Sequence, residues 1–296
     1  MAGLPMDQRD GWIWYDGEMV PWKDATLHVL THGLHYASSV FEGQRAYGGE
    51  IFKLHEHSER LIRSAGMLDF KLGYSADEID DACRAVLDKN GLVDAYMRPV
   101  AWRGSEEMGV AAANNSVHVA IAAWEWPSYY SREERLKGVR LIHSEWKRPS
   151  PETIPSAAKA AGLYMICTLS KHKATAQSCA DALMLDYRGY VAEATSANIF
   201  FARGKDIVTP LPDCFLNGIT RQTVIGLARE HGYTVTERHM RLEELSDFDE
   251  CFLTGTAAEV TPVREIGEFR FTPAAVSQTL VDAYMAEVQP KKAAAE

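Results

Sequence analysis

Residues 153–164 read TIPSAAKAAGLY and place a lysine, Lys159, among small side chains. Ser156 and two alanines precede it, and two alanines and Gly162 follow it. A lysine that forms a Schiff base with a flat aromatic aldehyde needs such open surroundings, together with partial burial that lowers the pKa of its amine from about 10.4. The same pattern also fits an exposed lysine at the start of an alanine-rich helix, so the stretch by itself leaves both interpretations open.

The chain around this stretch alternates between strand-like and helix-like patterns. Residues 138–146 predict a strand before it, and residues 164–177 predict a helix after it. Residues 180–194 predict two strands joined by a turn at Arg188-Gly189. Short strands over 198–204 and 251–263 and a helix over 220–232 complete an α/β pattern.

The N-terminal part shows a second, smaller α/β pattern. Asp16-Gly17 and Gly48-Gly49 are turn signals that predict two hairpins. Hydrophobic spacing over 54–68 predicts a helix, and Ser75 with Glu78 predicts a capping box at the start of the next one. Strands are expected at 95–102 and 117–124. Because PSYYSREERLKG lacks any hydrophobic period, we expect a small domain over residues 1–126, an interdomain loop over 127–138 and a large domain over 139–296.

The composition is typical of a globular protein and argues against two kinds of partner. The 296-residue chain is 46% hydrophobic and 24% charged, with a formal net charge of −10. Nucleic acids and anionic membranes attract basic surfaces, so neither is an expected partner. The longest apolar run, 117–124, is too short to cross a bilayer. The N-terminus lacks an export pattern, so we expect cytoplasmic residence.

Neither the cysteines nor the histidines indicate a metal site. The five cysteines are scattered without a C-x-x-C pair, which predicts reduced, buried thiols. His28, His32 and His35 have helical spacing, but Gly33 interrupts them and no carboxylate has a matching position. We therefore expect no metal, and we expect these histidines to shape a pocket mouth near Tyr36.

Two positions suit the binding of charged groups on a small ligand. Glu193 ends an apolar strand, and a carboxylate there would keep a pyridine nitrogen protonated, although a surface glutamate at a strand end has the same pattern. Tyr96 and Arg98 are two residues apart, so they project from the same face of a strand. Together they fit a carboxylate group, and a structural ion pair is the alternative.

Three further features of the sequence suit the binding of a phosphate group. Gly218, Ile219 and Thr220 open a helix, where free N–H groups favour an anion. Thr256 offers a hydroxyl in a loop of small residues, and Arg60 would supply a positive charge. Taken singly, each has a plainer explanation, since Thr220 also suits a helix cap and Arg60 suits a helix surface.

Together these segments resemble the fold-type IV pyridoxal-phosphate enzymes, and most closely the branched-chain amino acid aminotransferases. The resemblance runs from THGLHYASSVFEG through TIPSAAKAAGLY, VAEATSANIF and NGITR to TGTAAEVTPV. Five ordered segments at compatible spacing outweigh the structural explanations that each residue allows alone. The resemblance implies an α/β fold of α+β character with two domains, a small N-terminal one and a larger C-terminal pseudo-barrel that binds the cofactor.

The resemblance also implies a role for each matching residue. Lys159 would hold pyridoxal 5′-phosphate as a Schiff base and move the substrate proton, Glu193 would face the pyridine nitrogen, and Tyr164 would bind the 3′ oxygen. The implied phosphate positions are Arg60, Ile219, Thr220 and Thr256. The implied carboxylate positions are Tyr96, the N–H groups of Thr256 and Ala257, and Arg98 for the side chain of glutamate. The implied pocket wall comprises Tyr36, Phe41, Gly43, Val110, Trp126 and Tyr129.

The implied reaction is ping-pong transamination of Leu, Ile and Val with 2-oxoglutarate. Its partners are small-molecule amino acids and 2-oxo acids, and a second copy of the chain. Tyr36 and Val110 would enter from the neighbouring subunit, so the resemblance implies a homodimer at least, with a hexamer as a larger option. The segment 127–138 would close over the substrate.

Alternatives on the same fold remain open. Gln44, Leu163 and Trp124 depart from the family pattern and leave the substrate range less certain. A D-amino acid or (R)-amine transaminase, or an aminodeoxychorismate lyase, would keep Lys159 and Glu193. The pair Tyr96 and Arg98 favours the branched-chain type, and it also argues against a protein that merely stores the cofactor.

Overall fold

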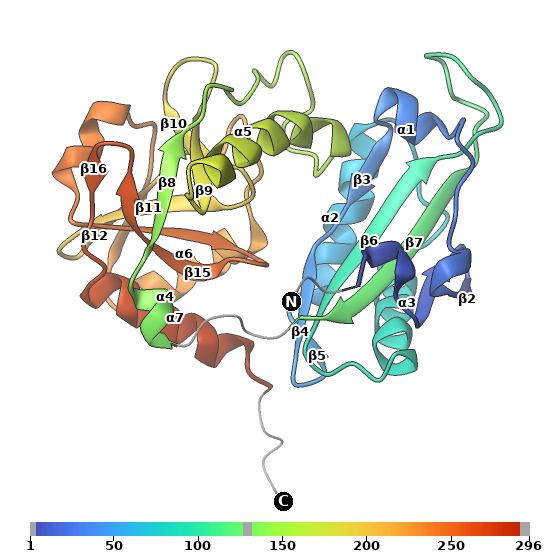
Figure 1. The fold of residues 1–296 in the computed structure, drawn as a ribbon, viewed down its shortest axis with the longest axis horizontal. Coiled ribbons are helices and arrows are strands. Elements are labelled where there is room, and N and C mark those ends of the chain that lie inside the picture. The colour runs from blue at the N-terminus through green and yellow to red at the C-terminus, as the bar shows by residue number, and fades with distance from the viewer. Residues whose placement is uncertain (1–3, 127–131, 291–296) are drawn as a thin grey trace, which may run out of the picture. The chain divides into compact units, whose positions relative to one another are not determined.

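The structure is a computed structural model that describes residues 4–126 and 132–290, and the chain forms two compact units (Figure 1). The first unit contains the described residues up to 126, the segment Ala158–Gly162 and Pro290. The second unit contains residues 132–157 and Leu163–Gln289. The sequence-based boundaries kept Lys159 with the C-terminal part, whereas the structure groups it with the first unit.

The first unit is built on an antiparallel sheet with the order β2-β1-β7-β6-β4-β5, in which β3 also pairs with β6. Both predicted hairpins are confirmed, and Asp16 and Gly17 adopt the positive φ angles that such a turn requires. The strands are β1 (Trp12–Tyr15), β2 (Glu18–Pro21), β3 (Ser39–Phe41), β4 (Gln44–Tyr47), β5 (Glu50–Ile51), β6 (Ala95–Arg103) and β7 (Val117–Glu125).

Helices α2 (Leu54–Met67) and α3 (Ala76–Lys89) cover one face of this sheet (Figure 1). The expected capping box is present, since the Ser75 side chain accepts from the Glu78 N–H and the Glu78 carboxylate accepts from the Ser75 N–H. Successive side chains of a strand point to opposite faces of the sheet, and Met97 and Ile121 are completely buried on the face that the helices cover. Tyr96 and Arg98 therefore point to the opposite face, which the short helix α1 (His32–Tyr36) borders.

The second unit is built on a mixed sheet with the order β10-β9-β8-β15-β14-β11-β12-β13, and β16 pairs with β15. β8 is parallel to both of its neighbours, and β12 is parallel to β13. The strands are β8 (Val139–His143), β9 (Asp181–Leu185), β10 (Val191–Ala194), β11 (Asn198–Arg203), β12 (Asp206–Thr209), β13 (Thr234–Glu237), β14 (Glu250–Gly255), β15 (Glu259–Ile266) and β16 (Phe269–Arg270). The helices are α4 (Arg132–Leu136), α5 (Met165–Ala176), α6 (Ile219–Glu230) and α7 (Ala275–Val288).

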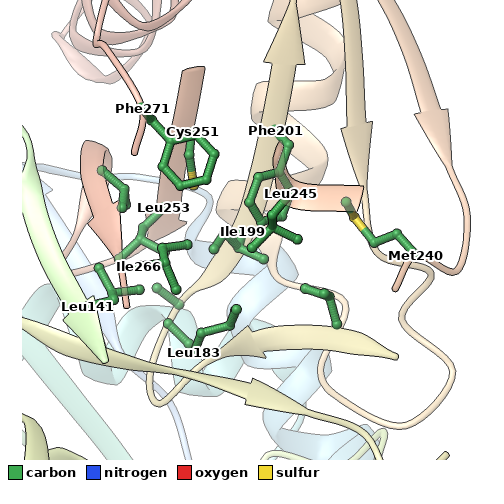
Figure 2. Packing of buried hydrophobic residues seen from close by; sticks show 14 of the residues in the cluster. Leu141, Leu183, Ile199, Phe201, Met240, Leu245, Cys251, Leu253, Ile266 and Phe271 are labelled. Carbon is green, nitrogen blue, oxygen red and sulfur yellow. The ribbon is translucent and has the colours of Figure 1, made fainter. Parts of the chain in front are cut away.

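The core of the second unit lies inside the curve of its sheet. Figure 2 shows Leu183 of β9 converging with Ile199 of β11, although three other strands separate β9 from β11 in the sheet order. Distant strands can share one cluster only if the sheet curls around it, as a pseudo-barrel does. On the other side of the sheet, the rings of Phe200 and Phe252 stack 5.0 Å apart. Burial on both faces explains why residues 199–202, IFFA, form a continuous apolar run.

Two expectations about local structure need correction. Residues 127–138 were expected to be irregular, but Arg132–Leu136 form α4, because a run of good helix formers makes one turn where Arg135 pairs with the buried carboxylate of Glu259. The strand expected over 138–146 is β8 and ends at His143. Along the described parts of the chain, none of the helices has the length and apolar content that a membrane span requires.

Candidate active site

Lys159 lies in the first unit, on a segment that pairs with β3. Its carbonyl accepts from the Phe41 N–H at 3.1 Å, and its own N–H donates to Ser64 Oγ at 3.0 Å. The Lys159 Nζ lies 5.0 Å from the centroid of the Phe41 ring. Ala158 and Ala160 are buried against the unit, so larger side chains would not fit there. The small neighbours seen in the sequence thus let the backbone approach β3 and leave the lysine half-buried.

Arg60 belongs to a buried ionic cluster in the same unit. Its Nε and Nη2 donate to the two carboxylate oxygens of Glu42 at 2.6 and 2.7 Å, and His57 Nδ1 lies 2.6 Å from Glu42 Oε2. Burial alone would raise the pKa of Glu42, but Arg60 and His57 hold it well below its usual range. Burial lowers the pKa of His57, and Arg60 and Lys159 add to that effect, while the Glu42 carboxylate opposes it. The carboxylate therefore fixes the guanidinium of Arg60 in one orientation.

Phe41, Gly43, Tyr96, Arg98 and Trp126 form one connected group. The Arg98 guanidinium lies 4.8 Å from the Phe41 ring centroid and donates to the Tyr96 hydroxyl at 3.1 Å. The rings of Tyr96 and Trp126 lie 5.2 Å apart, and a side chain at Gly43 would overlap the Tyr96 hydroxyl. The Nε of Arg98 is buried and has no hydrogen-bond partner among the described residues. A buried donor of this kind is suited to an anionic ligand.

A cavity of about 370 Å³ opens on the Arg98 face of the sheet. Its wall is mostly apolar and includes Leu34, Val100, Trp102 and Ala122. Among the described residues that line it, Arg98 supplies the guanidinium. The cavity thus combines a cation with apolar surface, as a pocket for small amphiphilic molecules does.

Tyr36 and Val110 belong to a second, exposed group of the first unit. Their exposed fractions are 43% and 84%. His32 joins the two segments, since its ring lies 4.6 Å from that of Tyr36 and its Nε2 lies 2.9 Å from the Gly109 carbonyl oxygen. Of the three histidines expected near Tyr36, His32 thus contacts its ring. Tyr129, the remaining predicted wall residue, is outside the described residues.

Arg148 and Asn198 of the second unit both contact Glu193. Its Oε1 lies 3.4 Å from Arg148 Nε, and its Oε2 accepts from Asn198 Nδ2 at 3.2 Å. Burial alone would lower the pKa of Arg148, but the Glu193 carboxylate raises it, so the guanidinium remains charged. The register of β10 against β9 shifts between Val191 and Glu193, and such a bulge turns a side chain out of the regular alternation.

The start of α6 has the features of an anion site. Gly218 occupies the N-cap position without a side-chain cap, so Ile219 and Thr220 begin a 12-residue helix whose first N–H groups are not capped by a side chain of the described residues. Asn198 Oδ1 accepts from the Gly218 N–H at 3.2 Å, and Asn198 Nδ2 donates to the Leu216 carbonyl at 3.0 Å. The loop before the helix is therefore tied to β11.

Thr256, Ala257 and Tyr164 also lie in the second unit. Thr256 and Ala257 lie in the turn 256–258 that connects β14 to β15. Tyr164 is the last residue before α5 and is partly exposed. All three are thus on turns or helix starts, where backbone N–H groups and side chains are accessible to a ligand.

Several residues that hold these groups were missed from the sequence. Glu42, Arg148 and Asn198 contact predicted site residues, but they are 18, 45 and 5 positions from those partners. Asn198 carried the clearest signal, because it is a polar residue directly before the apolar run IFFA. Glu42 and Arg148 carried none, since only the fold brings them to Arg60 and Glu193.

Two clusters of possible metal ligands occur among the described residues. One comprises His55, Asp77 and Asp80, and the other Asp186, Asp213 and Cys214. Arg188 pairs with both carboxylates of the second cluster, at 2.7 and 2.8 Å, and so supplies the positive charge that a metal would bring. His28, His32 and His35 do not converge, since the helix begins only at His32 and the three rings bond to different backbone and side-chain groups.

Comparison with known proteins defines the class of this chain. A family model described as amino-transferase class IV matches residues 39–266, which is most of the chain. The matched range contains Lys159, Glu193 and the start of α6. The chain therefore belongs to the class IV aminotransferases, as the sequence segments predicted.

Individual relatives narrow the class further. The branched-chain-amino-acid aminotransferase of Pseudomonas aeruginosa is 45% identical and is aligned over 89% of this chain and 87% of its own length. That of Escherichia coli is 40% identical over 96% of both chains. A solved branched-chain amino acid aminotransferase with pyridoxamine 5′-phosphate, from T.th., has a TM-score of 0.92, with 39% identity and 95% coverage of both chains. Within its class, the chain is thus a transferase of the branched-chain-amino-acid aminotransferase family, and the predicted fold class and enzyme class are confirmed.

Proposed function

We propose that this protein transfers the amino groups of Leu, Ile and Val to 2-oxoglutarate, using pyridoxal 5′-phosphate in a ping-pong reaction. One observation carries the proposal: Lys159 Nζ and the Arg98 guanidinium contact the same ring, that of Phe41, at 5.0 and 4.8 Å. An amine that can bond a cofactor and a guanidinium that can bind a carboxylate thus share one apolar surface. This is the pairing that a dual-substrate transaminase needs.

The residues of the chain fit the cofactor. Relatives have been solved with pyridoxamine 5′-phosphate and with N-(5′-phosphopyridoxyl)-L-glutamate. In this chain, the start of α6 has no side-chain cap from the described residues and suits a phosphate, and Glu193 is a carboxylate held for a cationic partner. When bound, pyridoxal phosphate supplies an aldehyde that condenses with amines and a protonated ring that accepts electrons.

Each residue of the proposed site has one task. The Lys159 amine would remove the α-proton of the substrate and return it, and Glu193 would hold a proton on the pyridine nitrogen. Tyr164 would donate a hydrogen bond to the 3′ oxygen. The residues that would bind the phosphate are Arg60, Ile219, Thr220 and Thr256. Tyr96 and the N–H groups of Thr256 and Ala257 bind the α-carboxylate, and Arg98 binds the second carboxylate of glutamate.

The apolar part of the substrate needs a wall of matching chemistry. Phe41, Gly43 and Trp126 are proposed to form it together with Tyr129. A relative has been solved with 4-methylvaleric acid, whose branched carbon chain resembles that of leucine. The same wall accepts glutamate only because Arg98 supplies a partner for its side chain, so selectivity between the two substrates depends on that residue.

A homodimer at least, in the cytoplasm, is part of the proposal. Tyr36 and Val110 are exposed, as are Leu34 and Val29, and an apolar surface of this kind suits burial against a second copy. Tyr36 and Val110 would then complete the neighbouring pocket, and the segment 127–138 between the two domains would close over the substrate. All five cysteines are free and buried, as expected in a reducing compartment.

Amino-donor specificity tests the proposal. The purified holoenzyme should transfer the amino group of L-Leu to 2-oxoglutarate, and L-Glu alone should convert the yellow form of the bound cofactor to the aminated form. D-Ala, aminodeoxychorismate and (R)-1-phenylethylamine serve as comparison substrates. No turnover of L-Leu, with turnover of one of these three, would assign the chain to a sister activity, and an unchanged spectrum with L-Glu would indicate a carrier.

A further inference from the structure

Asn198 joins two parts of the second unit that the sequence treats separately. It is the first residue of β11, and it is 5% exposed. Its Nδ2 donates to Glu193 Oε2 at 3.2 Å and to the Leu216 carbonyl at 3.0 Å, and its Oδ1 accepts from the Gly218 N–H at 3.2 Å. One side chain therefore connects the carboxylate on β10 with the loop that starts α6.

Only a primary amide satisfies this set of partners. Glu193 and Leu216 both present acceptors, and Gly218 presents a donor, so the side chain needs two N–H groups on one side and an oxygen on the other. Aspartate would place an acceptor against two acceptors, and leucine would make none of these three hydrogen bonds. Gly218 adds a steric condition, because a Cβ at this position would overlap Asn198 Oδ1. The loop and the amide are thus as close as the backbone allows.

This amide contributes to the orientation of Glu193. Arg148, a buried cation, lies 3.4 Å from the other carboxylate oxygen, Oε1. Without Asn198, the Arg148 charge would act on the carboxylate with less opposition and would turn it toward the guanidinium. With Asn198 present, both carboxylate oxygens of Glu193 have a partner. The Asn198 amide that binds Oε2 also binds the 216–218 loop.

We propose that Asn198 is a positioning residue that couples the phosphate end of the cofactor site to its ring-nitrogen end. The proposal rests on the proposed function, in which Glu193 faces the pyridine nitrogen and the start of α6 binds the phosphate. A phosphate that orders the 216–218 loop then also fixes the amide, and through it the carboxylate. The two ends of the ligand should therefore contribute to binding in a cooperative way.

Four ligands measure this coupling without reference to activity. They are pyridoxal 5′-phosphate, pyridoxal, and the analogues of both in which CH replaces the ring nitrogen. Titration of the cofactor-free full chain gives a dissociation constant for each. In the wild type, loss of the ring nitrogen should weaken binding about 10-fold more when the phosphate is present than when it is absent. Equal factors in the wild type would overturn the proposal, whatever the variants do.

Variants assign the coupling to Asn198. In Asn198→Ala, loss of the ring nitrogen should weaken binding by the same factor with and without the phosphate. In Asn198→Asp, the phosphate should still strengthen binding, because Oδ1 still accepts from the Gly218 N–H. The ring nitrogen should contribute less to binding in this variant. Thr209→Val is the matched control, since Thr209 is buried and donates to the Ile199 carbonyl of the same strand as Asn198 at 2.9 Å. It should keep the wild-type coupling.

Coupling that survives in Asn198→Ala, or disappears in Thr209→Val, would overturn the assignment. A wild-type chain that fails to bind pyridoxal phosphate would overturn the proposed function as well, so the two failures differ.

Discussion

The two units hold their site carboxylates in different ways. In the first unit, Glu42 is completely buried and uses both oxygens on Arg60, at 2.6 and 2.7 Å. In the second unit, Glu193 is 9% exposed, and its contacts with Arg148 and Asn198 are longer, at 3.4 and 3.2 Å. Glu42 is therefore a structural partner that orients a cation, whereas the longer contacts of Glu193 suit a carboxylate that also serves a ligand.

The same contrast extends to what each unit offers a ligand. The first unit presents cationic side chains, Lys159, Arg60 and Arg98, each fixed by an aromatic ring or a carboxylate. The second unit presents a carboxylate and the backbone N–H groups at the start of α6. A long cationic side chain keeps one orientation only when buried partners contact it. The N–H groups at a helix start are oriented by the helix backbone itself. We therefore expect substitutions in the first cluster to affect folding and substitutions around Glu193 to affect chemistry.

Replacement of Glu42 should produce the largest loss of stability. Glu42→Leu takes the carboxylate away from the buried guanidinium of Arg60, so the free energy of unfolding should fall by about 3–5 kcal/mol. Urea denaturation measures it. The double variant Glu42→Leu/Arg60→Met should recover most of that loss, because a buried ion pair can be replaced by apolar groups. A double variant as unstable as Glu42→Leu alone would show that the ion pair is not the cause.

Replacement of Glu193 should instead affect the reaction. Glu193→Gln removes the charge that we propose holds a proton on the ring, so kcat should fall about 10²–10³-fold while the cofactor stays bound. Steady-state kinetics with L-Leu and the visible absorbance of the holoenzyme report the two quantities. Glu237→Gln, in the same unit and paired with Arg221, is the control and should keep wild-type kcat. Turnover by Glu193→Gln within about twofold of the wild type would remove the proposed distinction between the two carboxylates.

Arg98 tests whether the cations of the first unit select between substrates. Arg98→Ala should lower kcat/KM for L-Glu about 10–100-fold more than for L-Leu, because a charge-assisted hydrogen bond to the side-chain carboxylate contributes about 1.5–3 kcal/mol. Arg84→Ala is an exposed control in the same unit and should change neither value. Equal losses for both amino acids would assign Arg98 a general role in the site.

Acidification should weaken the ionic cluster of the first unit. The pKa of His57 is lowered in the folded state, so below about pH 6.5 the unfolded chain binds the extra proton and folding stability falls as the pH falls. Urea denaturation between about pH 7 and pH 5.5 should show a shallower pH dependence for His57→Gln than for the wild type. His55 is the matched comparison, since a hydrogen bond to Asp80 raises its pKa, and His55→Gln should make the acid loss steeper. Identical slopes for both variants would exclude His57 as the source.

The smallest expected effect concerns Gln44, which is buried beside the cluster. Its Oε1 accepts from the Cys83 thiol, but its buried Nε2 has no hydrogen-bond partner in the described part of the chain. Gln44→Met removes that desolvated amide and should raise the free energy of unfolding by about 1 kcal/mol without changing kcat. Gln222→Met, on the exposed side of α6, is the control and should have no effect on stability. A destabilised Gln44→Met would mean that the amide is satisfied in solution.

Much of the local structure could be predicted because its causes are local. Both hairpins follow from Gly and Asp residues that tolerate positive φ, and α3 follows from Ser75 and Glu78, three residues apart. α4 was missed because five residues are too few to show a helical period. The placement of Lys159 with the first unit was missed because its segment pairs with β3, which lies far earlier in the chain.

The sequence by itself determined the α/β class, the capped helices and hairpins, and the segments that identify a class IV aminotransferase, since these depend on short-range spacing and on residue type. Only the tertiary structure decided which side chains hold the functional groups in place. Glu42 reaches Arg60, and Asn198 reaches both Glu193 and Gly218, through strand pairing and burial that bring distant positions to hydrogen-bond distance. Those contacts have no periodic signal along the chain, because their geometry exists only once the sheets have formed.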